Sequence, residues 1–407
     1  MDQITLSLGN AKRLIVHTQL TGIHIGNADE HADIAGIIEH LGYVQIDTIN
    51  VINRAHQHTL WTRIPGYTLH DVYATQAQEK TIFEYWGHAM SYLPMRDYRY
   101  FLPHKKKFID PYSKWEKDRL EKYGHLMTPV LERIREEGAM SSKDFASEEK
   151  PHKGTWWDWR PTKVALEMLF WQGKIMVAER KNFQKIFDLT ERVLPEDVDT
   201  RMPSEEELGR FLVERALKAY GLANKKEIVD HLRVAKKKLI LSALQEMLSD
   251  GSVVRVKVKH DDGDDHLEYY ALPGSIEETD DLSGADPEVY ILSPFDNFCI
   301  QRGRLKTFFD FDYALECYLP KEKRIFGYFT LPIFWKDGFA GRMDAKADRK
   351  SKELIIHHLK FEDTFRIDDA FSSEFQKKLI SFMKFQGCER IHLTKATPDG
   401  VELGLPG

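Results

Sequence analysis

The chain has 407 residues, of which 42% are hydrophobic and 30% charged, and its formal net charge is −6. This composition is typical of a soluble globular protein of two or three domains, and it excludes a disordered chain, a fibrous repeat and a strongly basic nucleic-acid coat protein. The three cysteines, Cys299, Cys317 and Cys388, are too few and too widely spaced for a disulfide scaffold or a zinc ribbon. Because the sequence shows neither an apolar stretch of membrane-spanning length nor a secretory leader, we expect a cytoplasmic protein.

One arrangement recurs three times along the first 260 residues: a helix with apolar periodicity, a glycine, and a short β-branched strand. The first copy is a helix over 34–41, Gly42 and a strand from residue 43. The second copy has a helix over 127–137, a helix over 164–172, and two strands over 174–179 and 184–191. These strands are joined by a short polar tip.

The third copy is the most complete. Ser204 with Glu207, and Asn224 with Glu227, form capping boxes that predict two helix starts. A lysine-rich helix and a hairpin around a DDGDD turn follow. A helix-turn-helix followed by a β-hairpin is typical of a winged helix. The alternative is three unrelated helical hairpins.

After about residue 285 the sequence changes to short strand-like runs. Lys336-Asp337-Gly338 predicts a hairpin turn, and apolar positions over 375–383 predict one amphipathic helix before a last strand. We therefore predict an α+β fold, made of tandem winged-helix (helix-turn-helix) units and a C-terminal, mostly antiparallel β domain. The expected domains are 1–105, 106–200, 201–280 and 281–407.

Positive charge is concentrated in the third unit. Residues 225–259 hold nine basic and four acidic residues, although the whole chain is acidic. Basic side chains gathered on a helix and a wing would contact a phosphate backbone and release its counterions. We expect DNA contacts from Lys236, Lys237 and Lys238. The alternative is a solvated helix face.

The segment LGYVQIDTINVINRAHQHTLWTR, residues 41–63, carries the candidate chemistry. In a strand, Gln45 and Asp47 point to the same face, with Cα atoms about 6–7 Å apart. A carboxylate beside an amide can hold and polarise a water, and it can stabilise a developing positive charge. On spacing alone, an exposed strand with a surface aspartate is the better explanation of the pair.

Four long blocks decide between these interpretations. GYVQIDTINVINRAHQHTLWTRIPGY, EYWGHAMSYLP, LSPFDNFCIQR and GYFTLPIFWKDGFAGRMDAKADRK resemble, in this order, the YcaQ-like (AlkX/AlkZ-type) winged-helix DNA glycosylases, and the similarity runs from about residue 8 to 395. Members of that family excise N7-alkylated guanine and unhook interstrand crosslinks. Their motif is Gln-x-Gln in one branch and Gln-x-Asp in the other. Gln45-Ile46-Asp47 resembles the second branch, which has the broader substrate range.

The resemblance implies a monofunctional DNA glycosylase whose catalytic residues are Gln45 and Asp47, with water as nucleophile and no Schiff base. It implies double-stranded DNA with alkylated or crosslinked guanine as partner, and we expect a monomer without metal or cofactor, since no metal-binding or nucleotide-binding motif is present. Further DNA contacts are expected from side chains in the blocks and downstream of the motif: Arg54, His56, His58, Arg63, His88 and Arg342. Two alternatives remain: a non-enzymatic winged-helix regulator of DNA, and a scaffold whose winged helices bind protein.

Overall fold

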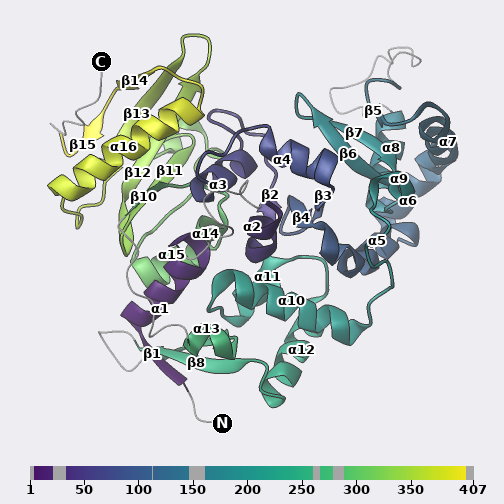
Figure 1. Cartoon of the computed structure of the whole chain (residues 1–407), viewed down its shortest axis with the longest axis horizontal. Helices are drawn as coiled ribbons and strands as arrows, with labels where there is room; N and C mark the ends of the chain where they lie inside the picture. The colour runs from purple at the N-terminus through teal and green to yellow at the C-terminus, as the bar shows by residue number, and fades with distance from the viewer. Residues whose placement is uncertain are drawn as a thin grey trace.

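The computed structural model describes residues 4–21, 34–111, 113–145, 161–259, 266–277 and 288–399. It confirms the α+β class. Four sheets with their helices follow one another around the molecule: the C-terminal sheet on the left of Figure 1, the first unit in the centre, the second on the right and the third at the bottom. No helix in these ranges is both long and apolar enough to cross a membrane.

The first unit is built on a three-stranded sheet in the order β2-β4-β3. Gly42 ends α2 with a φ of +78°, and a Cβ there would lie 2.4 Å from the ring of His231, so the position requires glycine. The predicted strand from residue 43 is correct only over two residues, and the segment from residue 55 is a helix. The elements are α2 (Ile34–Leu41), β2 (Val44–Gln45), α3 (Ala55–Arg63), α4 (Asp71–Ala74), η2 (Thr75–Glu79), β3 (Ile82–Trp86), β4 (Met90–Pro94) and η3 (Met95–Phe101).

The second unit carries a sheet in the order β5-β7-β6. Its first predicted helix, 127–137, has the bounds expected from the sequence, and Gly138 follows with a φ of +91°. The elements are α5 (Leu102–Ile109), α6 (Lys114–Tyr123), η4 (Gly124–Leu126), α7 (Met127–Glu137), β5 (Met140–Ser141), α8 (Pro161–Trp171), β6 (Ile175–Lys181), β7 (Gln184–Leu189) and α9 (Thr190–Val193).

The third unit contains both predicted capping boxes, at Ser204 with Glu207 and at Asn224 with Glu227. Strand β8 of its hairpin pairs in parallel with the N-terminal strand β1. The beginning of the chain therefore belongs to this sheet, whereas the expected 1–105 domain placed it in the first unit. The elements are β1 (Ile4–Ser7), α1 (Leu8–Val16), η1 (His17–Thr21), α10 (Glu205–Tyr220), α11 (Lys225–His231), α12 (Lys237–Ser249), β8 (Val254–Lys259), β9 (His266–Ala271) and α13 (Pro273–Glu277).

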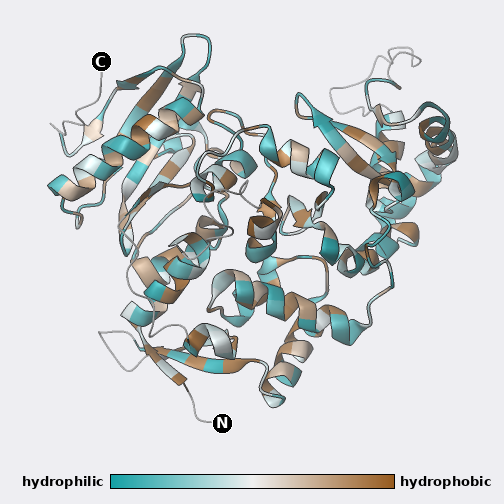
Figure 2. Ribbon diagram, viewed as in Figure 1, coloured by the Kyte–Doolittle hydropathy of each residue, from teal (hydrophilic) through white to brown (hydrophobic). Residues whose placement is uncertain are grey.

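The C-terminal domain is a sheet in the order β10-β11-β12-β13-β14, with β15 also pairing with β13. The first four strands are antiparallel, and the predicted hairpin pairs Trp335 with Gly338. Helix α16 lies across the sheet (Figure 1), and hydrophobic residues run along the strands beneath it (Figure 2). The elements are β10 (Val289–Ile291), α14 (Asn297–Ile300), α15 (Arg302–Phe309), η6 (Lys321–Lys323), β11 (Thr330–Trp335), β12 (Gly338–Asp348), β13 (Glu353–Phe361), α16 (Asp369–Phe385), β14 (Arg390–Leu393) and β15 (Ala396–Thr397).

Candidate catalytic site and DNA interface

Gln45 and Asp47 stand where the chain leaves the first sheet. Gln45 is the last residue of β2, pairs with Ser91 on β4, and is 8% exposed. The backbone N–H of Ile46 still donates to the Met90 carbonyl at 2.8 Å, but Asp47 belongs to no strand. The sheet therefore fixes the amide, while the carboxylate belongs to the irregular segment that follows the strand.

The Asp47 carboxylate is half-buried and only partly compensated. Its Oδ1 accepts a hydrogen bond from the Ile49 N–H at 2.7 Å. Burial raises the pKa of Asp47, against the opposing effects of the Ile49 and Thr48 N–H groups and the positive charge of Arg54. No ion pair of Asp47 is present within the described ranges. A negative charge held in this way can interact strongly with a cation brought against it.

The C-terminal domain holds the segment around the motif in place. The Asn297 Nδ2 donates to the carbonyl of Tyr43, just before β2, at 3.0 Å. After the motif, the Asn53 N–H donates to the Gln386 Oε1 at 2.6 Å, and the Asn53 Nδ2 donates to the Phe385 carbonyl at 2.7 Å. The candidate catalytic segment is thus fixed at both ends by residues more than 200 positions away in the sequence.

Two of the predicted DNA contacts, Arg54 and His88, remain partly exposed. The Arg54 guanidinium stacks over the ring of Phe183, at the tip of the β6–β7 hairpin, at 3.8 Å. The Nδ1 of His88 lies 2.7 Å from the Asp230 carbonyl, and its ring stacks on Tyr43. Both side chains are held by neighbouring units and stay candidates for contact with DNA.

Four other predicted contacts are corrected by their burial. Both histidines of α3 are fully buried, and burial lowers the pKa of His58 to about 4, so its ring is neutral. Arg63 forms a bidentate ion pair with Asp296, with both side chains 0% exposed. Arg342 is paired with Glu362 and stacked on aromatic rings. The residues that cannot reach a phosphate backbone in this structure are His56, His58, Arg63 and Arg342.

The three predicted lysines lie exposed at the start of α12, where Lys236 is the N-cap and Lys237 and Lys238 begin the first turn. A helix N-terminus carries unsatisfied N–H groups and the positive end of the helix dipole. Lysines added there make a surface well suited to phosphate. The exposure agrees with the predicted contact, and equally with the solvated helix face.

The sequence interpretation missed an exposed loop between α15 and β11. Tyr318 and Ile325 are 76% and 77% exposed. Partial burial raises the pKa of Tyr318, with smaller contributions from Cys317 and from the negative charge of Asp47, so Tyr318 lies within electrostatic reach of that carboxylate. The buried Glu316 accepts hydrogen bonds from the backbone N–H groups of Ile325, Phe326 and Gly327, which makes the loop rigid. The available signal was the run YLPKEKRIF, in which large apolar residues flank a charged Lys-Glu-Lys-Arg segment.

The structure superposes on the Streptomyces sahachiroi DNA glycosylase AlkZ with a TM-score of 0.63 and 14% sequence identity, covering 96% of this chain and 100% of that protein. Residues 38–378 match the model of the DNA glycosylase AlkZ-like family. The chain belongs to this family, and it is a DNA glycosylase.

Proposed function

We propose that this DNA glycosylase hydrolyses the N-glycosidic bond of N7-alkylated guanine in duplex DNA, and that it unhooks interstrand crosslinks formed at that atom. The observation that carries the proposal is the half-buried Asp47 carboxylate, free of an ion pair in the described part of the chain, two residues beyond Gln45. This arrangement supports the chemistry that the sequence resemblance implies for the Gln-x-Asp branch of the family.

The leaving group explains how so small a site can suffice. An N7-alkylguanine carries a positive charge and departs as a neutral base, so no strong general acid is required. As the bond breaks, positive charge develops on the sugar, and Asp47 stabilises it electrostatically. Asp47 then accepts a proton from the attacking water, which the Gln45 amide positions. No lysine stands in residues 41–63, so the nucleophile is water and no Schiff base forms with the motif.

A crosslinked guanine also limits the shape of the site. A base joined to the opposite strand cannot rotate freely by roughly 180° into an enclosed pocket, as most base-flipping enzymes require. Asp47 follows the end of β2, and its charge acts on Tyr318 in the exposed loop before β11. We infer that this loop approaches the duplex at the lesion and that the reaction takes place on a distorted but largely stacked helix.

Defined oligonucleotides test the substrate class. We expect release of N7-methylguanine and unhooking of N7–N7 nitrogen-mustard crosslinks in the presence of EDTA, and no release of uracil or 8-oxoguanine, because those bases are neutral leaving groups. Products are separated on denaturing gels after alkaline cleavage. Efficient uracil excision would refute the leaving-group argument. Salt-sensitive binding without any base release would indicate the regulator, and no binding the scaffold.

Replacing Gln45 with Ala should slow excision less than replacing Asp47 with Asn, with nearly unchanged affinity for DNA. The physical reason is that the amide orients the water, whereas the carboxylate supplies the charge. Single-turnover rates and fluorescence anisotropy on an abasic-site duplex measure the two effects separately. A variant that loses mainly affinity would show Gln45 to be a DNA contact.

Charge reversal at Lys236, Lys237 and Lys238 should weaken binding to all duplexes alike. Each lost phosphate contact should reduce the steepness of log K against log salt concentration by roughly 0.9. Reversal of Lys377, exposed on α16 of the C-terminal domain, is the control and should leave the slope unchanged. Equal slopes for the α12 variant and the wild type would mean that this face is only solvated.

A further inference from the structure

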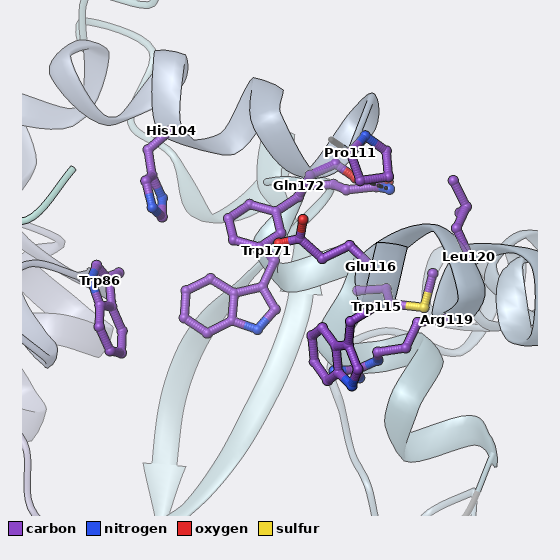
Figure 3. Close-up of a pocket in the computed structure, with 11 residues that line it drawn as sticks. Trp86, His104, Pro111, Trp115, Glu116, Arg119, Leu120, Trp171 and Gln172 are labelled. Atoms are coloured by element: carbon purple, nitrogen blue, oxygen red, sulfur yellow. Dashed lines mark hydrogen bonds between the residues drawn. The ribbon is translucent and has the colours of Figure 1, made fainter. Parts of the chain in front are cut away.

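A concave site lies between the first two units, and no residue of the Gln-x-Asp motif lines it. It is a pocket of about 450 Å³, within the roughly 300–1,000 Å³ typical of ligand sites. Three tryptophans from three different elements line it: Trp86 at the end of β3, Trp115 on α6 and Trp171 on α8 (Figure 3).

The aromatic lining is preorganised on one side and open on the other. The indole of Trp171 stacks on the ring of Phe108 at 5.4 Å and contacts Trp86 edge-on at 6.0 Å. Trp115 is 64% exposed, although it is a large aromatic side chain beside a pocket. Exposed aromatic rings next to a concave apolar surface indicate a binding site for a flat ligand.

Polar groups at the rim indicate that the ligand also forms hydrogen bonds. The Gln172 Nε2 donates to the Phe108 carbonyl at 2.9 Å, which leaves the amide oxygen as an acceptor. One Glu116 carboxylate oxygen accepts a hydrogen bond from the Ser113 hydroxyl at 2.5 Å, which leaves the other oxygen as an acceptor. Both residues line the pocket together with Arg119. Flat apolar faces with hydrogen-bonding groups at their edges match a nucleobase, whereas a lipid chain would leave these groups unused.

The pocket is connected to the candidate site by the first sheet. Trp86 pairs with Met90, and the Met90 carbonyl accepts the hydrogen bond from the N–H of Ile46, the residue inside the motif. On the other side, the Lys107 Nζ donates to the carbonyl of Val234, two residues before the lysine cluster of α12. Hydrogen bonds therefore link β3, which carries Trp86, to the motif, and α5, which carries Phe108, to the segment before α12.

We propose that this pocket receives an unpaired nucleobase of the bound DNA and stacks it against Trp115 and Trp171. The proposal rests on the proposed function, since it requires DNA on this face. The released alkylguanine and a base still attached to the strand are both flat rings with hydrogen-bonding edges, so either would match the pocket. We commit to the attached base, because the elements that line the pocket are hydrogen-bonded to both surfaces proposed to hold the duplex, and because each base stacked on an aromatic ring strengthens binding of unpaired nucleic acid.

The test uses the full chain and a duplex with 2-aminopurine opposite a tetrahydrofuran abasic analogue. Binding should quench 2-aminopurine emission, because stacking on indole quenches it. Trp115→Ala should abolish most of the quenching and weaken binding about tenfold, the order expected for one lost base–aromatic stack. Trp115→Phe should retain much of the affinity, because a phenyl ring still stacks on the base, and the quenching that remains should come from the Trp171 indole. Ile109→Ala, exposed on α5 and outside the lining, is the matched control and should behave as wild type.

Two further arms separate the possible failures. A duplex with paired 2-aminopurine six positions from the abasic analogue should show no quenching, and added free 7-methylguanine should not compete if the occupant is an attached base. Asp47→Asn should keep the quenching, since the pocket does no chemistry. Wild-type quenching and affinity in Trp115→Ala, or competition by the free base, would overturn the proposal while leaving the excision results untouched. Quenching without excision would instead refute the proposed function alone.

Discussion

Replacing Asp47 with Asn should slow single-turnover excision of N7-methylguanine by about 10²–10³, the usual cost of removing one preorganised electrostatic contact to a transition state. The substitution preserves the shape of the side chain and removes only its charge. The Ile49 N–H that donates to the carboxylate can still donate to an amide oxygen, so folding should be unaffected. Excision under enzyme excess, with the affinity measured separately, gives the effect on the chemical step.

The pH dependence follows from the same residue. Burial raises the pKa of Asp47, so protonation removes the catalytic charge at a higher pH than for an exposed aspartate. The wild-type rate should fall as the pH is lowered through this raised pKa, and the residual rate of Asp47→Asn should lack that step. Asp310→Asn, at an exposed aspartate, is the control. A rate within a few-fold of wild type for Asp47→Asn would remove Asp47 from the mechanism.

Local features were predictable because their determinants are close in the sequence. The capping boxes at Ser204 and Asn224 each need only a partner three residues away, and the hairpin at Lys336 needs only its turn. The path after Gln45 was not predictable in this way. The chain leaves the sheet there, and Asn53 is held by residues at the end of α16, more than 300 positions further on.

The same limit applies to the candidate DNA contacts. Arginine and histidine bind phosphates at a surface and also satisfy buried carboxylates and carbonyls in a core, and spacing alone does not distinguish the two. His58 lies against the Ile291 carbonyl and Arg63 against Asp296, both 233 residues away in the sequence. The lysines of α12 were easier to place, because lysine is rarely buried without a partner.

These contacts give the C-terminal domain a positioning role. Asp296 caps α14 by accepting from the Phe298 N–H at 2.9 Å and also receives both Arg63 nitrogens at 2.7 Å. The next residue, Asn297, donates to the Tyr43 carbonyl before β2. One short turn thus fixes both the motif strand and α3. Loss of this turn should lower the excision rate more than the affinity for DNA.

Arg63→Met should therefore lower the free energy of unfolding by about 3–5 kcal/mol, because it leaves the Asp296 carboxylate buried without its counter-charge. Replacing the pair together, as Arg63→Met with Asp296→Asn, should restore part of the loss, since the amide oxygen can still cap α14 and no buried charge remains. The midpoint of urea unfolding at an unchanged slope measures the difference.

The affinity for DNA distinguishes this role from the contact predicted by the sequence. With both side chains 0% exposed, the Arg63 guanidinium neutralises no phosphate in this structure, so folded Arg63→Met should bind an abasic-site duplex with the salt dependence of wild type. Arg54→Met is the comparison, because Arg54 is partly exposed. If Arg54 contacts a phosphate, this replacement should reduce the steepness of log K against log salt concentration by roughly 0.9. An Arg63→Met variant of wild-type stability with a reduced slope would show that the buried pair opens to meet DNA.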